Sequence, residues 1–146
     1  MALLFPWIAT LSAALFAGGA LFVSVVEHPA RMKAGVAVAL AEFRPSYRRA
    51  APWQASTAAL SFLAGALGSF LTWQWLWAVG GLLVGATIPF TLVVILPVNR
   101  RLLDSSALLT EAEAASLFER WARLHWVRSA LGTGGLIVLL CKAFFL

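Results

Sequence analysis

The sequence predicts an all-α integral membrane protein, built as a four-helix bundle. Apolar residue types make up 62% of its 146 residues and charged types only 12%, and the mean hydropathy is +0.89. Soluble domains carry about 25% charged residues, so this composition argues against a soluble enzyme and against a disordered chain. In addition, four apolar stretches are each long enough to cross a bilayer, which takes roughly 20 residues.

The four stretches lie within a single domain, residues 1–146, and run over about residues 3–26, 53–71, 75–98 and 127–145. Each should be a helix, because backbone groups inside a bilayer have no water to bond. The first stretch is not expected to be a signal peptide, since no Lys or Arg precedes it. Pro89 should kink the third helix. Small residues such as Gly65 and Gly81 should let neighbouring helices pack closely within one chain.

The basic residues predict the orientation of these helices. All of the 11 Lys and Arg residues except Lys142 lie between the first and second stretches, between the third and fourth, or just inside the fourth. The positive-inside rule therefore places both long connections in the cytoplasm and both termini on the outer side. We expect an integral protein of the bacterial inner membrane. The net charge of +5 is explained by these boundary residues, so no nucleic-acid partner is expected.

The two cytoplasmic connections are expected to contain short interfacial helices. Residues 31–43 are rich in Ala, Val and Leu, and Arg44-Pro45-Ser46 should end the helix that they form. The second connection contains the run Thr110-Glu111-Ala112-Glu113, which has the capping-box pattern that starts a helix. A helix that begins there is able to continue directly into the fourth membrane span.

Polar residues gather at the cytoplasmic ends of the four predicted spans, which form one layer in an up-down bundle. They are Glu27, His28, Gln54, Asn99, His125 and Arg128. On the fourth helix, Trp121, His125 and Arg128 are separated by four and three residues, so these three side chains share one face. The sequence therefore predicts a shallow pocket at this end of the bundle.

Arg128 lies about one turn inside its apolar stretch, where a charge at full depth costs about 2.5–3.5 kcal/mol. It should therefore face the bundle and have a partner, and Glu27 is the expected one. A salt bridge that only holds the first and fourth helices together is the structural alternative to a role in a site.

The chain has only two histidines, His28 and His125, and both fall at the same predicted level of the bilayer. Three roles are open for them. Imidazole titrates near neutral pH and can act as a general base. Both histidines with Glu27 would form a ligand set suited to iron or copper. A histidine can also be an axial ligand of haem, although no Cys-x-x-Cys-His motif for covalent haem is present. The cofactor is thus undecided, and none is favoured.

Four motifs together resemble the anthrone-oxygenase-like family of small four-helix membrane proteins, which in bacteria is largely a domain of unknown function. They are Val25-Val26-Glu27-His28-Pro29-Ala30, Phe43-Arg44-Pro45-Ser46-Tyr47-Arg48-Arg49-Ala50, Pro97-Val98-Asn99-Arg100-Arg101-Leu102 and Trp121-Ala122-Arg123-Leu124-His125-Trp126-Val127-Arg128. The resemblance implies oxidation of an anthrone to an anthraquinone with O₂. Such a reaction needs a base, a donor for the enolate oxygen and a dry pocket, and in principle no metal.

The resemblance implies roles for the clustered residues. His28 or His125 would be the base, and Arg128 and Asn99 would stabilise the enolate or a peroxide. The expected substrate contacts are Glu27, Tyr47, Gln54 and Trp121. We therefore expect a membrane oxygenase-like protein acting on a flat, lipophilic, anthrone- or quinol-like substrate that enters from the inner leaflet. The alternatives are a metal- or haem-binding redox protein and a non-catalytic membrane subunit, and the sequence leaves homo-oligomer formation open.

Overall fold

The computed structural model describes residues 4–106 and 108–145, and within these ranges it is entirely helical apart from turns and short connections. Its elements, in chain order, are α1 (Leu4–Phe22), the π-helix η1 (Val23–Glu27), α2 (His28–Lys33), α3 (Val36–Thr72), α4 (Leu76–Gly85), α5 (Thr87–Phe90), the π-helix η2 (Thr91–Ile95), α6 (Leu96–Leu103) and α7 (Glu111–Phe145). They combine into four long helical segments, each apolar and long enough to cross a membrane. The all-α prediction is confirmed.

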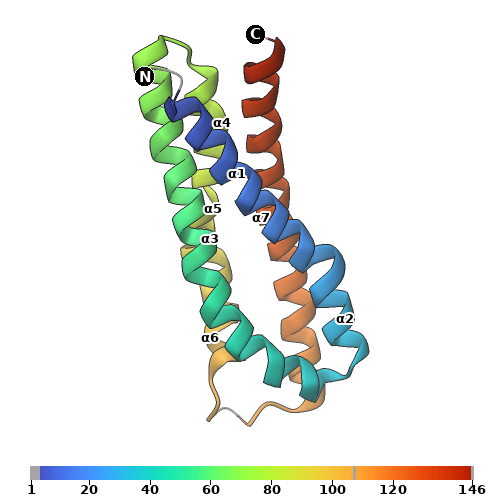
Figure 1. The fold of residues 1–146 in the computed structure, drawn as a ribbon. Coiled ribbons are helices and arrows are strands. Elements are labelled where there is room, and N and C mark those ends of the chain that lie inside the picture. Colours follow the sequence, from blue (N-terminus) through green and yellow to red (C-terminus); the bar gives the residue numbers. More distant parts are fainter. Residues whose placement is uncertain (1–3, 107, 146) are drawn as a thin grey trace.

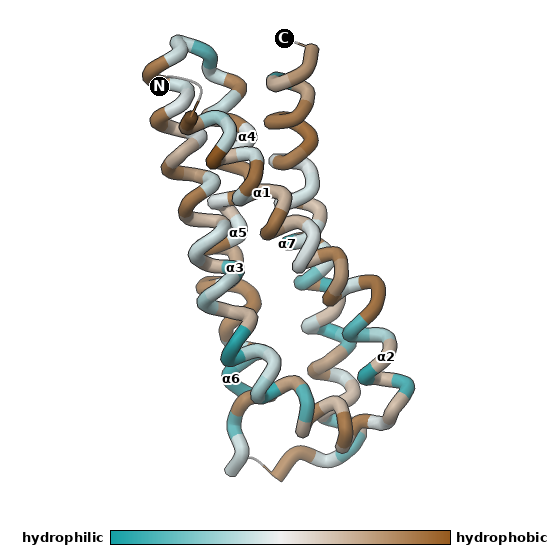
Figure 2. Tube along the Cα trace, viewed as in Figure 1, coloured by the Kyte–Doolittle hydropathy of each residue, from teal (hydrophilic) through white to brown (hydrophobic). Residues whose placement is uncertain are grey.

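The four segments run up and down alongside one another (Figure 1). Both chain termini and the short turn between α3 and α4 lie at one end, which we call the termini end. The turn after α2 and the connection between α6 and α7 lie at the other, which we call the loop end. Hydrophilic residues are concentrated toward the loop end (Figure 2).

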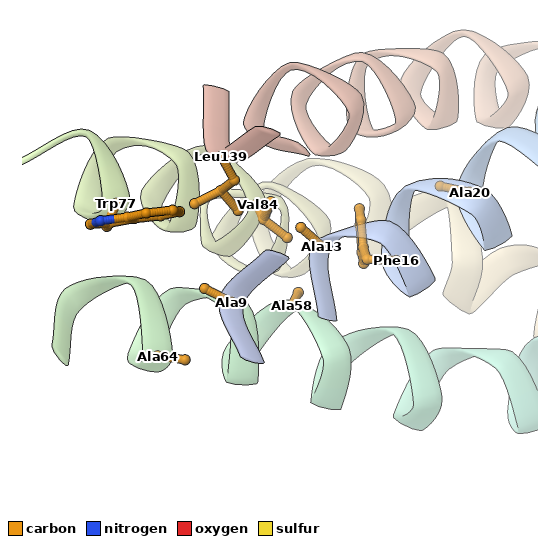
Figure 3. Packing of buried hydrophobic residues seen from close by; sticks show 9 residues of the cluster. All are labelled: Ala9, Ala13, Phe16, Ala20, Ala58, Ala64, Trp77, Val84 and Leu139. Atoms are coloured by element: carbon orange, nitrogen blue, oxygen red, sulfur yellow. The ribbon is translucent and has the colours of Figure 1, made fainter. Parts of the chain in front are cut away.

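The buried apolar residues form two clusters of different character. The cluster nearer the termini end is rich in alanine and consists of Ala9, Ala13, Phe16, Ala20, Ala58, Ala64, Trp77, Val84 and Leu139 (Figure 3). The cluster nearer the loop end contains larger side chains, namely Ala39, Phe43, Ile95, Val98, Leu102, Phe118 and Trp121. Alanine side chains allow close helix packing in the first cluster. The second cluster is filled by larger aromatic and aliphatic side chains.

The predicted separate helix over residues 31–43 is wrong. The chain turns at Gly35, whose φ of 100° is readily adopted only by glycine, and α3 then continues without a break through Pro45 and Pro52. The first helical segment also extends beyond the expected end at residue 26, to Lys33.

Packing explains why Pro45 does not end the helix. A proline inside a helix removes one backbone hydrogen bond and costs about 3 kcal/mol or more. The turn before Pro45 is fixed by Phe43, which is fully buried, and by Arg44, which donates hydrogen bonds to the carbonyls of Leu102 and Asp104. These contacts with the α6 end of the bundle outweigh the local preference of proline.

Two predictions about α7, its start at the capping box and its continuation into the fourth span, are confirmed. The hydroxyl of Thr110 accepts a hydrogen bond from the backbone N–H of Glu113, and the Glu113 carboxylate accepts one from the N–H of Thr110, so the capping box starts α7. This helix then continues to Phe145. The third segment is interrupted at Ala86, three residues before Pro89, and becomes π-helical from Thr91.

Glycines bring α3 and α4 into backbone contact near the termini end. A Cβ atom added to Gly65 would lie 2.6 Å from the carbonyl oxygen of Trp77, and one added to Gly81 would lie 2.9 Å from that of Ser61. At Gly134 of α7, by contrast, an added Cβ would meet nothing within 4 Å.

We therefore predict opposite effects for two Gly→Ala substitutions. Gly65→Ala should lower the free energy of unfolding by about 1–3 kcal/mol through overpacking. Gly134→Ala should be neutral, or stabilising by up to about 1 kcal/mol, because alanine has the higher helix propensity. The midpoint of thermal unfolding in detergent, followed by circular dichroism, checks both. Equal effects at the two positions would contradict the close α3–α4 contact.

Candidate functional site

A pocket opens between the helices in the half of the bundle nearer the loop end. Its walls come from all four helical segments and include seven of the eight residues singled out from the sequence. These are Glu27, Tyr47, Gln54, Asn99, Trp121, His125 and Arg128. The eighth, His28, does not line this pocket. It packs against the indole of Trp121, with a distance of 5.3 Å between ring centroids.

Both π-helices contribute to this pocket. η1 supplies Val23 and Glu27, and η2 supplies Thr91 and Ile95. A π-helical turn contains one more residue than the α-helical register allows, which re-aims the side chains that follow, and such turns are frequent at functional sites. Two of the four helical segments therefore line the pocket with π-helical turns.

A hydrogen-bonded chain crosses the pocket from α7 to α3. Nε1 of Trp121 donates to Oδ1 of Asn99 over 2.9 Å, and Nδ2 of Asn99 donates to the hydroxyl oxygen of Tyr47 over 2.8 Å. Asn99 has no exposed surface. The indole N–H can only donate, so it requires the amide oxygen of Asn99 to face it. The amide nitrogen must then face Tyr47.

This chain sets the direction of the Tyr47 hydroxyl. Its oxygen already accepts a hydrogen from Asn99, so its own hydrogen is directed elsewhere. Tyr47 lines the pocket, and its ring stacks on Phe43 with 5.5 Å between centroids. The phenol is thus a positioned hydrogen-bond donor for an oxygen atom of a bound ligand.

A second chain holds His125 from the other side. Ser129 Oγ donates to the carbonyl oxygen of Ala20 over 3.2 Å, Ser24 Oγ lies 2.9 Å from Ser129 Oγ, and Nδ1 of His125 lies 3.0 Å from Ser24 Oγ. Ser129 Oγ is also 3.5 Å from Nδ1, which is long for a hydrogen bond. His125, Ser24 and Ser129 are all buried.

Counting hydrogens along this chain assigns the tautomer of His125. Ser129 uses its single hydrogen on the Ala20 carbonyl, so Ser24 must donate to Ser129. Ser24 is then an acceptor toward His125, and Nδ1 must carry the ring hydrogen. All three contacts are satisfied together only in this arrangement. The unprotonated nitrogen of the neutral ring is consequently Nε2.

Arg128 lies within the pocket but does not pair with Glu27, so that prediction is wrong. Arg128 donates to Oε1 of Gln54, and its guanidinium carbon lies 5.1 Å from the centre of the Phe16 ring. Its Nε is buried and has no hydrogen-bond partner among the residues that the structure describes. The guanidinium therefore has donor capacity left for a ligand.

Glu27 has closer partners than Arg128. It forms an ion pair with Arg31, one helical turn further along the same segment, and accepts a hydrogen bond from Ser46 Oγ over 2.9 Å. Arg31 also reaches Glu42, with 2.7 Å between Nε and Oε2. The i,i+4 spacing of Glu27 and Arg31 is a signal in the sequence for this pair.

Arg31 is a pocket residue that the sequence did not predict, because its position suggests only a charge at the membrane boundary. It is buried and lines the pocket. Its guanidinium carbon lies 5.5 Å from the centre of the Phe43 ring and 6.0 Å from that of Trp121, within the range of cation–π attraction. Ser24 and Ser129, which form the hydrogen-bonded chain to His125, were also not predicted, because no sequence motif marks them.

The two histidines and Glu27 are not assembled as metal ligands. Trp121 contacts both imidazoles, stacking on His125 with 4.6 Å between centroids and packing against His28 on a tilted ring. The Glu27 carboxylate is engaged by Arg31 and Ser46. Over residues 4–106 and 108–145 there is no group of three His, Cys, Asp or Glu side chains that could hold a metal ion.

The fold and the pocket define a class: a small four-helix protein of membrane-spanning dimensions, with a polar site between its helices that is lined by an imidazole, a phenol and a guanidinium. Within this class, the chain belongs to the anthrone oxygenase family, because the family model described as Anthrone oxygenase matches residues 43–138. The match includes Tyr47 and Arg128 and leaves out Glu27 and His28. Searches of the curated proteins and of the solved structures give no match.

The hydrogen bond between Trp121 and Asn99 predicts coupled effects on stability. Asn99→Leu would leave the buried indole N–H without an acceptor and should cost about 1–3 kcal/mol. Trp121→Phe would leave the amide oxygen without its donor. The double variant should lose less than the sum of the two single losses, by about 0.5–3 kcal/mol. Chemical or thermal unfolding in detergent measures this, and strictly additive losses would contradict the chain.

Proposed function

We propose that the protein is a membrane oxygenase that oxidises a lipophilic aromatic carbon acid of the anthrone type with O₂ in this pocket. The observation that carries the proposal is the hydrogen-bonded chain that leaves Nε2 of His125 unprotonated, in a pocket shared with the Tyr47 hydroxyl and the Arg128 guanidinium. Membership of the anthrone oxygenase family supports the reaction type.

The first step is proton transfer from the ring methylene of the substrate to Nε2 of His125. Oγ of Ser24 accepts a hydrogen bond from Nδ1–H of His125 and so stabilises the imidazolium that forms. Stacking of Trp121 on His125 holds the ring plane. Geometry favours His125 over His28 as the base, because His125 lines the pocket and His28 does not.

The second requirement is stabilisation of the negative charge that develops on the substrate carbonyl oxygen. Tyr47 donates its hydroxyl hydrogen to this oxygen, and Asn99 polarises that hydroxyl by donating to it. Arg128, which lines the same pocket as Tyr47, supplies a charged donor. Donors that are already positioned lower the barrier because they need no reorganisation as the charge appears.

The remaining chemistry takes place between the enolate and O₂. The enolate carbon transfers one electron to O₂, and the two radicals combine to form a C–O bond. The proton held by His125 passes to the peroxide and gives a hydroperoxide. Loss of the second methylene proton, with cleavage of the O–O bond, yields the ketone and hydroxide, and that proton and the hydroxide form water. The balance is R₂CH₂ + O₂ → R₂C=O + H₂O.

The proposal includes an orientation in the inner membrane of a bacterium. The loop end carries most of the basic residues, and the positive-inside rule assigns that end to the cytoplasm. Both termini then lie on the outer side, and the pocket lies near the inner leaflet, which supplies a lipophilic substrate.

The two histidines provide a matched pair of variants for testing the base. His125→Ala should reduce oxygen uptake with anthrone about 100-fold or more, since a positioned base contributes roughly 10²–10⁴-fold. His28→Ala should keep near-wild-type turnover. Each variant should still show a cooperative melting transition in detergent, which identifies it as folded. Full activity of the folded His125→Ala variant would contradict the assignment, and so would loss of activity only in His28→Ala.

Removal of one oxyanion donor should lower kcat without unfolding the protein. We expect Tyr47→Phe to lower kcat for anthrone about 10²-fold, because the loss of a single such donor typically costs 10²–10³-fold. The stacking on Phe43 is kept in this variant. Unchanged kcat would remove Tyr47 from the mechanism.

The purified protein also separates the base mechanism from the redox-cofactor alternative. An optical spectrum combined with metal analysis is the measurement. Near-stoichiometric iron, copper or haem that is lost in His125→Ala, together with loss of turnover, would overturn the base mechanism. Full turnover of a metal-free preparation supports it.

A further inference from the structure

A second cavity adjoins the polar pocket and continues it toward the middle of the bundle. The two cavities share Tyr47, Ala51, Gln54, Thr91 and Arg128. The remaining lining of the second is almost wholly apolar: Phe16, Ala55, Ala58, Thr87, Ile88 and Leu92. Space that admits water-sized molecules amounts to about 140 Å³ in the second cavity and about 40 Å³ in the first. The room for a ligand body therefore lies in the apolar part.

The second cavity has the shape of a groove between α3 and the α5–η2 segment. On α3, the wall consists of Ala51, Ala55 and Ala58, which are spaced by four and three residues and so share one face. Ile88 and Leu92, one turn apart, form the facing wall. Because alanine extends only one methyl group from the helix, the width of the groove depends on these positions remaining small.

The groove opens at the surface of the bundle, between α3 and η2. Ala55 is exposed, and Leu92 is 58% exposed. Both residues belong to helical segments that are apolar enough to span a membrane. In a bilayer this opening would face lipid chains rather than water.

We propose that this groove holds the ring body of a flat apolar ligand and admits it sideways from the membrane, with the oxygen end of the ligand at Tyr47 and Arg128. The identity of the ligand as an aromatic ketone rests on the proposed function. Ala55, at the opening, sets the width of the ligand that can pass.

The inner end of the groove favours such a ligand over a simple hydrocarbon chain. Arg128 has a buried Nε without a partner among the described residues, and the Tyr47 hydroxyl hydrogen is directed away from Asn99. A buried donor without an acceptor is unfavourable, because it has lost its hydrogen bonds to water. A ligand with an acceptor oxygen at one end and apolar rings behind it satisfies both parts of the cavity.

The first test narrows the groove. Ala55→Phe should raise the KM for anthrone about tenfold or more, a change of about 1.4 kcal/mol. Ala66→Phe is the matched control, because Ala66 is also exposed on α3 and does not line the groove. Its KM should equal that of the wild type, and both variants should melt alike. Equal KM values for Ala55→Phe and Ala66→Phe would overturn the proposal.

The second test measures occupancy without turnover. Cys141 is the only cysteine and is exposed, so Cys141→Ser gives a cysteine-free background. In that background, 9,10-anthraquinone should slow the reaction of Ala55→Cys with N-ethylmaleimide in detergent and leave that of Ala66→Cys unchanged. Lack of protection at Ala55→Cys would overturn the proposal, and so would equal protection at both positions or protection by palmitate but not by anthraquinone.

The two tests separate the groove from the reaction. If the wild-type protein does not oxidise anthrone but anthraquinone protects Ala55→Cys alone, the groove is supported and the proposed function fails. If the wild type oxidises anthrone but Ala55→Phe behaves like Ala66→Phe, the groove is overturned and the proposed function stands.

Discussion

The indole of Trp121 is the group on which the rest of the site depends. Its buried N–H can only donate, so it determines which way the Asn99 amide faces and, through Asn99, that the Tyr47 hydroxyl hydrogen points away from Asn99. The same ring contacts both His125 and His28. One aromatic side chain thus orients the phenol and packs against both imidazoles.

Helix packing differs between the two halves of the bundle. Near the termini end, glycines bring α3 and α4 into backbone contact. Toward the loop end, η1 and η2 interrupt the α-helical register, and larger aromatic side chains line the walls. The polar pocket and the apolar groove lie where these two regions of the bundle meet. Arg128 and Tyr47 stand where the two cavities meet, so a ligand with one polar end has a single favourable orientation.

Sequence patterns predict the parts of this structure that depend on local physics. Apolar length gives the four helical segments, the Thr110–Glu113 pattern gives the start of α7, and helical spacing places Trp121, His125 and Arg128 on one face. Tertiary contacts decide the rest. Packing contacts keep α3 helical through Pro45. Glu27 pairs with Arg31, and Arg128 instead donates a hydrogen bond to Gln54. The hydroxyls that fix the His125 tautomer come from two different helical segments, which no single stretch of sequence can show.

The family match and the geometry bear on different parts of the proposed mechanism. The match begins at residue 43 and includes the imidazole, the phenol and the guanidinium. The acceptor for the Nδ1 hydrogen of His125 is Ser24, which lies in η1, outside the matched stretch. Without an acceptor at that position, the neutral imidazole has no reason to keep its hydrogen on Nδ1 and leave Nε2 unprotonated. The first helical segment is therefore more than a wall of the bundle, because through Ser24 it determines which nitrogen of His125 carries the ring hydrogen.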